Sequence, residues 1–227
     1  MQVKKRGGMM ENVSFDKITS RIKYLKDDLI ISPALVSQKV VKTIYHGIST
    51  EEIDDHTANI AANMCTIHPD YNLLAGKILI SNLHKNTHDD YLQVVDELYN
   101  NYVCENVVCG KNIISTRKHN PLISKKLFNF VKQHHEAINA FVDYKKDYTY
   151  DFFSFRTLER AYLLKINDRI IERPQHMLLR IALGHYMDDL IKIRRMYIDL
   201  SINYILPQHQ HYIIVEHLGP NVHLVLL

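Results

Sequence analysis

Tryptophan is absent from this sequence of 227 residues, and cysteine is scarce, occurring only as Cys65, Cys104 and Cys109. No two of these thiols have the CxxC spacing, so the sequence predicts neither a disulfide framework nor a zinc site. Unpaired cysteines are typical of a reducing compartment, and we therefore expect a cytoplasmic protein. The three thiols are interpreted as small apolar residues of the core.

Long apolar runs and a strong charge of one sign are also missing. No stretch of about 18 apolar residues occurs, so we expect no transmembrane helix. The basic N-terminus lacks a following apolar segment, which argues against a secretory signal. A net charge of +3 is small for the length, and it favours neither nucleic acid nor a membrane as partner. The 14 histidines are scattered without the H-E-x-x-H spacing, so no metal site is expected.

What is present begins with an N-terminal hairpin signal. Residues 2–13 form two short segments on either side of Gly7-Gly8, a dipeptide that can supply the positive φ angles of a two-residue turn. Ser14 follows as the expected N-cap of a helix, and Asp16 stands in the first turn, where the helix dipole favours negative charge. Residues 2–25 therefore predict a β-hairpin followed by an amphipathic helix.

Three further helix starts follow. Ser32-Pro33 is an N-cap with proline at the first helical position, and it predicts a helix that ends at Gly47. Ser49 and Glu52 form a capping-box pattern, and a fourth helix is expected after Pro69. We thus expect residues 1–88 to be a β-hairpin on a four-helix bundle.

The rest of the chain is less uniform. Residues 89–145 are mixed, with helical periodicity at 91–102 and 122–131. Residues 147–200 are expected to be helical again, with breaks at Asn167-Asp168 and Pro174. After Ser201 no amphipathic pattern continues.

Several of these segments resemble the large subunit of class I ribonucleotide reductases, in the same order and at the same spacing. The motifs are VSFDKITSRI at 13–22, HPDY at 68–71, SNLHK at 81–85, TLER at 157–160, LLKIN at 163–167 and ERPQHML at 172–178. The resemblance implies an ATP-cone domain at residues 1–88. It also implies the helical N-terminal region of the large chain at 89–204, so the expected fold class is mainly α.

The resemblance also implies an allosteric site for ATP or dATP, accompanied by magnesium, with no cofactor held by the chain itself. In the family, the matching positions surround the nucleotide; here they are Lys5, Arg6, Glu11, Asn12, Val13, Ser14, Phe15, Asp16, Lys17, Thr50, Asp54 and Lys85. The family uses the acid at Asp54 to tell inhibitory dATP from ATP. Its turn usually reads Lys-Arg-Asp-Gly-Arg, whereas this chain has Gly7, Gly8 and Met9 after Arg6. We expect the missing acid and arginine to loosen the loop or lower the nucleotide affinity.

The family's catalytic part is not expected in this chain. The reaction removes the ribose 2′-hydroxyl through a cysteine radical and a redox cysteine pair, all in a ten-stranded barrel. None of the three cysteines matches those positions, so no catalytic residue is assigned.

The tail has a specific interpretation. Residues 205–227 do not resemble the family's next segment, but their codons read one nucleotide out of frame can encode it. The shifted codons can give Thr-Ala-Thr-Pro-Thr-Leu-Tyr-Asn-Ser, then Gly-Thr-Pro-Arg-Pro, then Gln-Cys-Ser-Ser-Cys-Phe-Leu. We interpret residues 205–227 as an out-of-frame tail.

These observations predict a ribonucleoside-diphosphate reductase large chain cut short by a frameshift. The intact family enzyme makes deoxynucleotides for DNA synthesis with a thioredoxin-type thiol reductant. Its partners are a small radical-generating subunit and further copies of the large chain. The alternative is a non-catalytic ATP/dATP-binding module or gene remnant. A cone-containing transcriptional repressor is disfavoured because it needs a zinc ribbon.

Overall fold

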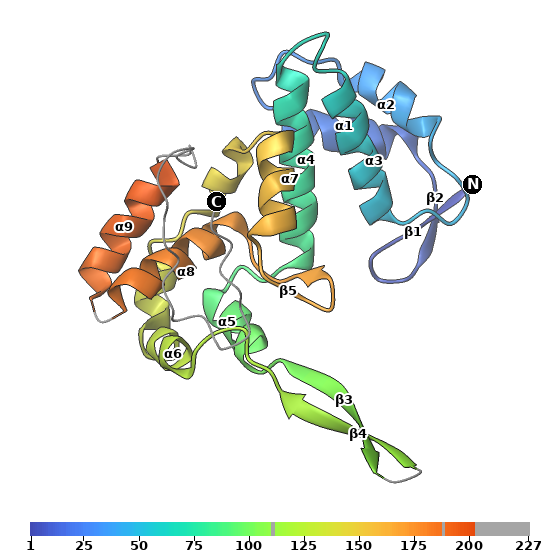
Figure 1. Ribbon diagram of the computed structural model, residues 1–227. Helices are drawn as coiled ribbons and strands as arrows, with labels where there is room; N and C mark the ends of the chain where they lie inside the picture. The colour runs from blue at the N-terminus through green and yellow to red at the C-terminus, as the bar shows by residue number, and fades with distance from the viewer. Residues whose placement is uncertain (110–111, 188, 203–227) are drawn as a thin grey trace. The chain divides into compact units, whose positions relative to one another are not determined.

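The computed structural model describes residues 1–109, 112–187 and 189–202 as a mainly helical chain with short antiparallel strand pairs and no barrel (Figure 1). The chain divides into two compact units, Met1–Asn86 with Lys145–Tyr162, and Thr87–Tyr144 with the residues from Leu163 onward. The segment interpreted as an out-of-frame tail lies outside the described residues.

The first unit contains β1 (Gln2–Lys4), β2 (Met10–Asn12), α1 (Phe15–Lys26), α2 (Pro33–Val41), α3 (Thr50–Asn63), α4 (Asp70–Asn86), most of the 3-10 helix η1 (Tyr144–Thr149), and α7 (Phe152–Ala161). The second contains α5 (Tyr91–Tyr99), β3 (Tyr102–Cys109), β4 (Asn112–His119), α6 (Lys125–Asn139), β5 (Lys165–Ile166), β6 (Arg169–Ile170), α8 (Pro174–Tyr186) and α9 (Leu190–Ile202).

Serine caps start the first three helices, as the sequence predicts. Ser14 Oγ accepts a hydrogen bond from the Lys17 amide at 3.4 Å, and Ser32 Oγ accepts one from the Leu35 amide at the same distance. The capping box of α3 is also confirmed. There the Glu52 amide donates to Ser49 Oγ at 3.1 Å, and the Ser49 amide donates to Glu52 Oε2 at 2.8 Å. Each cap satisfies amide groups that have no partner within the helix.

The expectation that α2 continues to Gly47 is wrong. The helix ends at Val41, and Gly47 has φ 87°, a left-handed conformation that breaks a helix. Instead, the backbone of residues 47–48 forms hydrogen bonds with β1. The Gly47 amide donates to the Gln2 carbonyl at 2.8 Å, and the Lys4 amide donates to the Ile48 carbonyl at 2.9 Å. This pairing places the N-terminal hairpin beside the start of α3.

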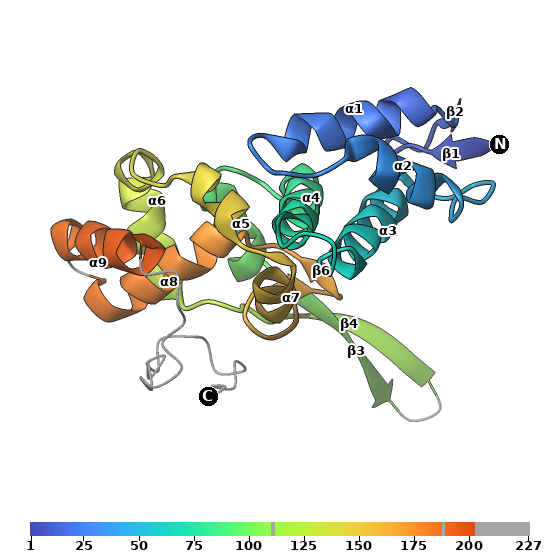
Figure 2. The same ribbon diagram turned by 90° about the horizontal axis from the view of Figure 1, so that it is seen from above.

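Helix α4 is the centre of the first unit. It carries buried residues around most of its circumference, which is typical of a helix enclosed on all sides. Figure 2 shows α1, α3 and α7 arranged around it. On the side facing α7, a Cβ added to Gly76 would lie 2.2 Å from the Tyr150 carbonyl oxygen, so only glycine permits this approach.

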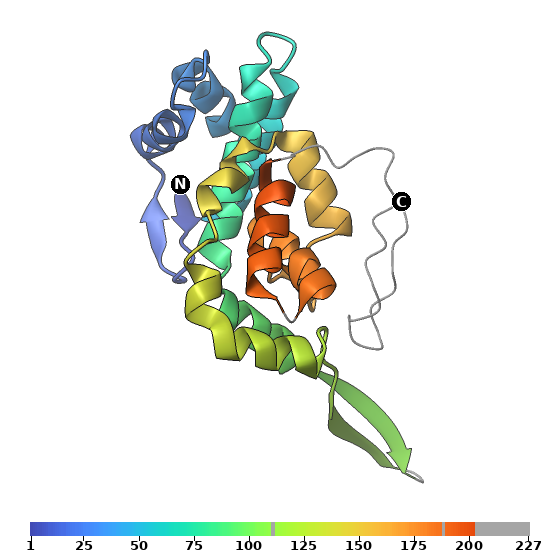
Figure 3. The same ribbon diagram turned by 90° about the vertical axis from the view of Figure 1, so that its left-hand side faces the viewer.

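The second unit is organised around buried polar groups on α8. The Arg180 guanidinium donates to both carboxylate oxygens of Glu172, at 2.7 and 3.0 Å, and both side chains are almost fully buried. Glu172 Oε2 also accepts from the Leu164 amide at 3.0 Å. Helix α9 packs beside α8 in Figure 3. These contacts give the buried carboxylate and the buried guanidinium partners of opposite charge inside the protein.

Of the two strand pairs in the second unit, the sequence indicated the turn of one and did not indicate the other. The break expected at Asn167-Asp168 is the turn of the β5–β6 hairpin, where these residues have φ 48° and 63°. The hairpin of β3 and β4 was not predicted, since residues 89–145 were expected only to be mixed, with helical periodicity at 91–102 and 122–131. Instead α5 ends at Tyr99 and β3 begins at Tyr102, and the hairpin extends away from α5 and α6 (Figure 3).

Two negative findings concern the described residues. None of their helices is long and apolar enough to cross a membrane. The interpretation of the cysteines as buried residues is wrong for two of them, because Cys65 and Cys104 are free and exposed.

Candidate functional site

The candidate site lies where the N-terminal hairpin meets three helices of the first unit. Its turn differs from the expected two-residue form. The Gly8 amide donates to the Lys5 carbonyl at 2.8 Å, and the Lys5 amide donates to the Met9 carbonyl at 2.8 Å. Arg6 and Gly7 therefore occupy the centre of a β-turn, and only Gly8 has a positive φ, of 82°. This three-residue loop with a final left-handed glycine is a common hairpin connection.

One group of charges joins the hairpin to the first turn of α1. Glu11 of β2 accepts from Lys5 Nζ at 2.9 Å and also from Lys17 Nζ. Hydrogen bonds from Lys17 and then from Lys5 hold the pKa of the Glu11 carboxyl below its usual range. The side chains of Lys5 and Glu11 are each 37% exposed and that of Lys17 is 64% exposed, so we call them the exposed cluster.

A second group surrounds Asp54, whose side chain is only 6% exposed. Arg21 of α1 binds it with two hydrogen bonds, from Nε to Oδ1 at 2.6 Å and from Nη2 to Oδ2 at 2.8 Å. Arg6 Nη2 and Lys85 Nζ each lie 3.6 Å from Asp54 Oδ2. Three cations thus converge on one buried carboxylate, and we call this group the buried cluster.

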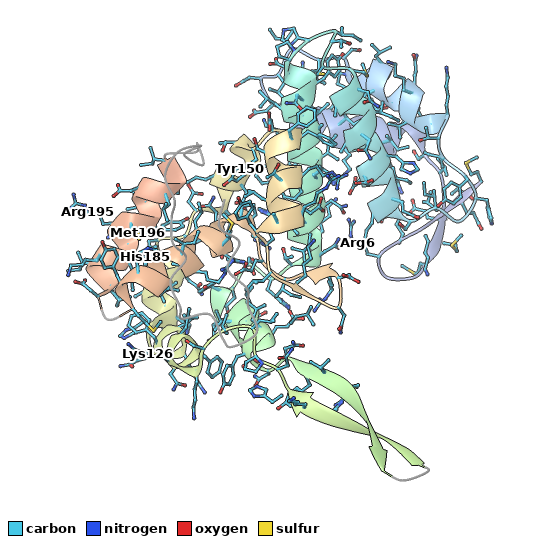
Figure 4. The ribbon with its side chains drawn as sticks, in the orientation of Figure 1. Arg6, Lys126, Tyr150, His185, Arg195 and Met196 are labelled. Carbon is cyan, nitrogen blue, oxygen red and sulfur yellow. The ribbon has the colours of Figure 1, made fainter. Side chains whose placement is uncertain are left out.

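Arg6 is held in place by α3 and α4. Its Nε donates to Asn86 Oδ1 at 3.0 Å, and its Nη2 donates to the Asn82 side chain. Glu51, in the first turn of α3, lies 3.5 Å from Arg6 Nε. Figure 4 shows Arg6 between the hairpin turn and α4.

The buried cluster has more positive than negative charge. The pKa of the Lys85 ammonium is lowered, first by burial and then by repulsion from Arg21 and Arg6, although Asp54 opposes the shift. Since Asp54 is already bound by Arg21, its charge does not compensate all three cations. The side chains joined by ion pairs in the two clusters comprise five cations and the three carboxylates of Glu11, Glu51 and Asp54.

An arrangement of this kind can bind an anion of high charge. Arginine presents planar donors that match phosphate oxygens, and lysine adds mobile positive charge. The N-terminus of α1 adds unpaired amides and a positive dipole end beside the exposed cluster. None of the described residues forms a group of three or more side chains suited to holding a metal ion.

The structure brings together half of the residues expected at the site, namely Lys5, Arg6, Glu11, Lys17, Asp54 and Lys85. The others lie on the adjoining backbone. Asn12 ends β2, the Val13 amide donates to the Met1 carbonyl at 3.2 Å, and Ser14 caps α1. Phe15 and Asp16 are exposed in the first turn of α1, and Thr50 is the first residue of α3. Their role in nucleotide binding stays a prediction.

Sequence reasoning missed four side chains that complete the site: Arg21, Glu51, Asn82 and Asn86. Helical spacing could have indicated three of them. Arg21 lies four residues after Lys17 and so shares its helix face, while Asn82 lies three residues before Lys85 and four before Asn86 on α4. Glu51 gave no comparable signal, because an acid in a first helical turn is explained by the dipole alone.

Comparison with known protein families gives two matches. The profile of the ATP cone domain matches residues 1–86, which contain both clusters. The profile of the ribonucleotide reductase all-alpha domain matches residues 148–208.

Similar curated proteins come from distant organisms. The chain is 44% identical over 207 residues to the ribonucleoside-diphosphate reductase large subunit of Dictyostelium discoideum, which covers 88% of this chain and 23% of that protein. It is 45% identical over 193 residues to the large subunit of Monkeypox virus, covering 84% of this chain and 24% of the relative. The chain therefore spans about a quarter of the length of the relatives it matches.

Proposed function

Since the chain belongs to the ribonucleotide reductase large-subunit family, as an N-terminal part of it, we propose that residues 1–88 bind ATP and dATP as allosteric effectors. The observation that carries the proposal is the convergence of Arg6, Arg21 and Lys85 on the single buried carboxylate of Asp54. A nucleoside triphosphate supplies the missing negative charge, and magnesium accompanies it as a counterion of the phosphates.

The arrangement of the cations supports a phosphate chain as the ligand. Lys5 of the hairpin and Lys17 of α1 form the exposed cluster with Glu11, whereas Arg6 and Lys85 border the buried carboxylate. Positive groups spread over neighbouring elements suit a ligand with several charged phosphates. The carboxylate of Asp54 would then face the sugar or base, where it can separate dATP from ATP.

The test is calorimetric titration of the full 227-residue chain with ATP and with dATP. Micromolar affinity, about −8 kcal/mol, is expected for a regulatory site. Lys17→Ala should weaken binding, whereas Lys23→Ala, which removes an exposed lysine from the same helix, should leave it unchanged. Absence of heat and of any thermal shift with both nucleotides would refute the proposal.

For the whole enzyme we propose the reduction of ribonucleoside diphosphates to deoxyribonucleoside diphosphates. A small radical-generating subunit, further copies of the large chain and a thioredoxin-type reductant would take part, in the cytoplasm. Residues 89–204 would form the helical start of the catalytic subunit. We assign no catalytic residue to the 227 residues present.

We also propose that residues 205–227 are an out-of-frame translation of the next family segment. Support comes from the codons, since two bases of each shifted codon are fixed largely by the residues present. The test is to resequence the gene across the codons for Tyr204 to Pro207. CDP reduction should be absent for the chain as it stands and present when the frame is restored, and turnover by the short chain would contradict this interpretation.

A further inference from the structure

The two clusters of the site differ in how their carboxylates are held. Glu11 is exposed and contacts the flexible ammonium groups of Lys5 and Lys17. Asp54 is buried and is bound through both oxygens by the rigid guanidinium of Arg21. The first carboxylate can exchange its partners for water, whereas the second cannot leave without uncovering a buried charge.

The clusters share one surface because each takes a residue from the same two elements. Lys5 and Arg6 are consecutive in the hairpin turn, and Lys17 and Arg21 are one helical turn apart on α1. A phosphate chain that reaches Arg6 and Lys85 therefore extends toward Lys5 and Lys17. In the nucleotide-free protein, the carboxylate of Glu11 forms ion pairs with these two lysines.

We propose that Glu11 is a built-in competitor of the phosphate chain: its carboxylate neutralises Lys5 and Lys17 in the free protein and is displaced when a triphosphate binds. The inference rests on the proposed nucleotide site and adds how its affinity is set. Asp54 stays in place on Arg21, so the two carboxylates have opposite roles. Glu11 lowers affinity by competition, and Asp54 remains as part of the bound site.

Displacement of Glu11 is feasible because its carboxylate can be hydrated and because the triphosphate carries more negative charge. The Glu11 side chain is 37% exposed, so the carboxylate can become hydrated once the lysines turn to phosphate. Its replacement carries several negative charges within reach of the same two ammonium groups. Exchange of the two exposed ion pairs of Glu11 for stronger contacts with phosphate favours the bound state.

The experiment compares Glu11→Gln with the parent in the full chain, titrated with ATP and with inorganic tripolyphosphate. Glutamine keeps the size of the side chain and one acceptor oxygen but removes its charge. We expect about threefold to tenfold tighter binding of both ligands, since two exposed ion pairs no longer compete. Glu136→Gln, an exposed change of the same kind on α6, should have no effect.

A double-mutant cycle gives the second readout. In a Lys17→Ala background, Glu11→Gln should increase the affinity less, because one of the two lysines for which Glu11 and phosphate compete is already absent. Unchanged or weaker binding by Glu11→Gln would overturn the inference, as would a gain that is independent of Lys17. A cooperative thermal transition near that of the parent checks that the variant is folded.

The two proposals fail separately. If the parent bound neither nucleotide but Glu11→Gln bound tripolyphosphate, the proposed function would fail while the competition would stand. If the parent bound ATP and Glu11→Gln bound it no better, the nucleotide site would stand and the competition would be refuted. If neither chain bound tripolyphosphate, the competition would also be refuted.

Discussion

Arg21–Asp54 in the first unit and Arg180–Glu172 in the second are both two-point ion pairs on a buried carboxylate, but the Arg21 side chain is 28% exposed and that of Arg180 only 7%. Around Glu172, the Arg180 guanidinium and the Leu164 amide both donate to the carboxylate. Around Asp54, Arg6 and Lys85 add charge that the carboxylate does not compensate. A balanced pair stabilises a fold, whereas an unbalanced one also prepares a place for an anion.

The largest expected effect separates the two pairs by stability. Arg180→Ala leaves Glu172 buried without its guanidinium, and it should lower the free energy of unfolding of the second unit by about 3–5 kcal/mol. Urea unfolding followed by circular dichroism measures this change. Arg195→Ala, on the exposed side of α9, is the matched control and should have little effect. Equal effects of the two substitutions would show that the buried ion pair does not contribute to the free energy of unfolding.

Asp54→Asn should destabilise the protein less than Arg180→Ala does. Its main effect should be on the selectivity between dATP and ATP. The asparagine keeps the shape but loses the charged hydrogen bonds to Arg21, at a cost of about 1–3 kcal/mol. We expect discrimination between dATP and ATP to weaken more than binding overall. Titration with each nucleotide and a thermal melt measure the two effects. An equal loss of both affinities would make Asp54 a structural residue like Glu172.

Gly8→Ala tests whether the turn positions Arg6 for the unbalanced cluster. A side chain at φ 82° should cost about 1–2 kcal/mol of stability and weaken nucleotide binding modestly. Gly7→Ala is the control, because its φ is not in the left-handed range and its added Cβ meets open space. Thermal melts of both variants, with and without ATP, make the comparison. Equal results would contradict the described turn.

The smallest expected effect is a pH dependence of nucleotide binding. The pKa of Lys85 is lowered in the free site, and a bound anion should raise it again, so binding takes up a proton. Affinity should therefore fall as pH rises through the interval between these two pKa values, by less than tenfold per pH unit. Calorimetry in buffers of different ionisation enthalpy detects the proton. Lys85→Arg, which stays charged, should remove this dependence.

Local signals predicted much of the first unit. Ser14, Ser32 and Ser49 mark helix starts because a cap is set by neighbouring residues alone. The end of α2 could not be read in this way, since it depends on pairing between residues 47–49 and a strand far away in sequence. The β3–β4 hairpin was missed because no strand pattern was recognised between the helical periodicities at 91–102 and 122–131.

The same distinction applies to the candidate site. The resemblance supplied Lys5, Arg6 and Asp54, but only the structure assigns the lysines to Glu11 and Arg21 to Asp54. Such pairings join side chains from different elements, and spacing along the chain does not determine them. The surplus charge around Asp54 likewise becomes visible only when all of its neighbours are known.

The close approach at Gly76 bears on how the cone could be cut out of the chain or exchanged between proteins. The face of α4 that carries Gly76 is covered by backbone at Tyr150 and Asp151, about 60 residues beyond the helix. During synthesis, the first 86 residues emerge before Tyr150 and Asp151, so the Gly76 face of α4 stays exposed until this later segment packs against it. A transplanted cone that ends at Asn86 would keep its charged site but carry an open apolar seam. A transferable version should therefore include Lys145–Tyr162 through a linker.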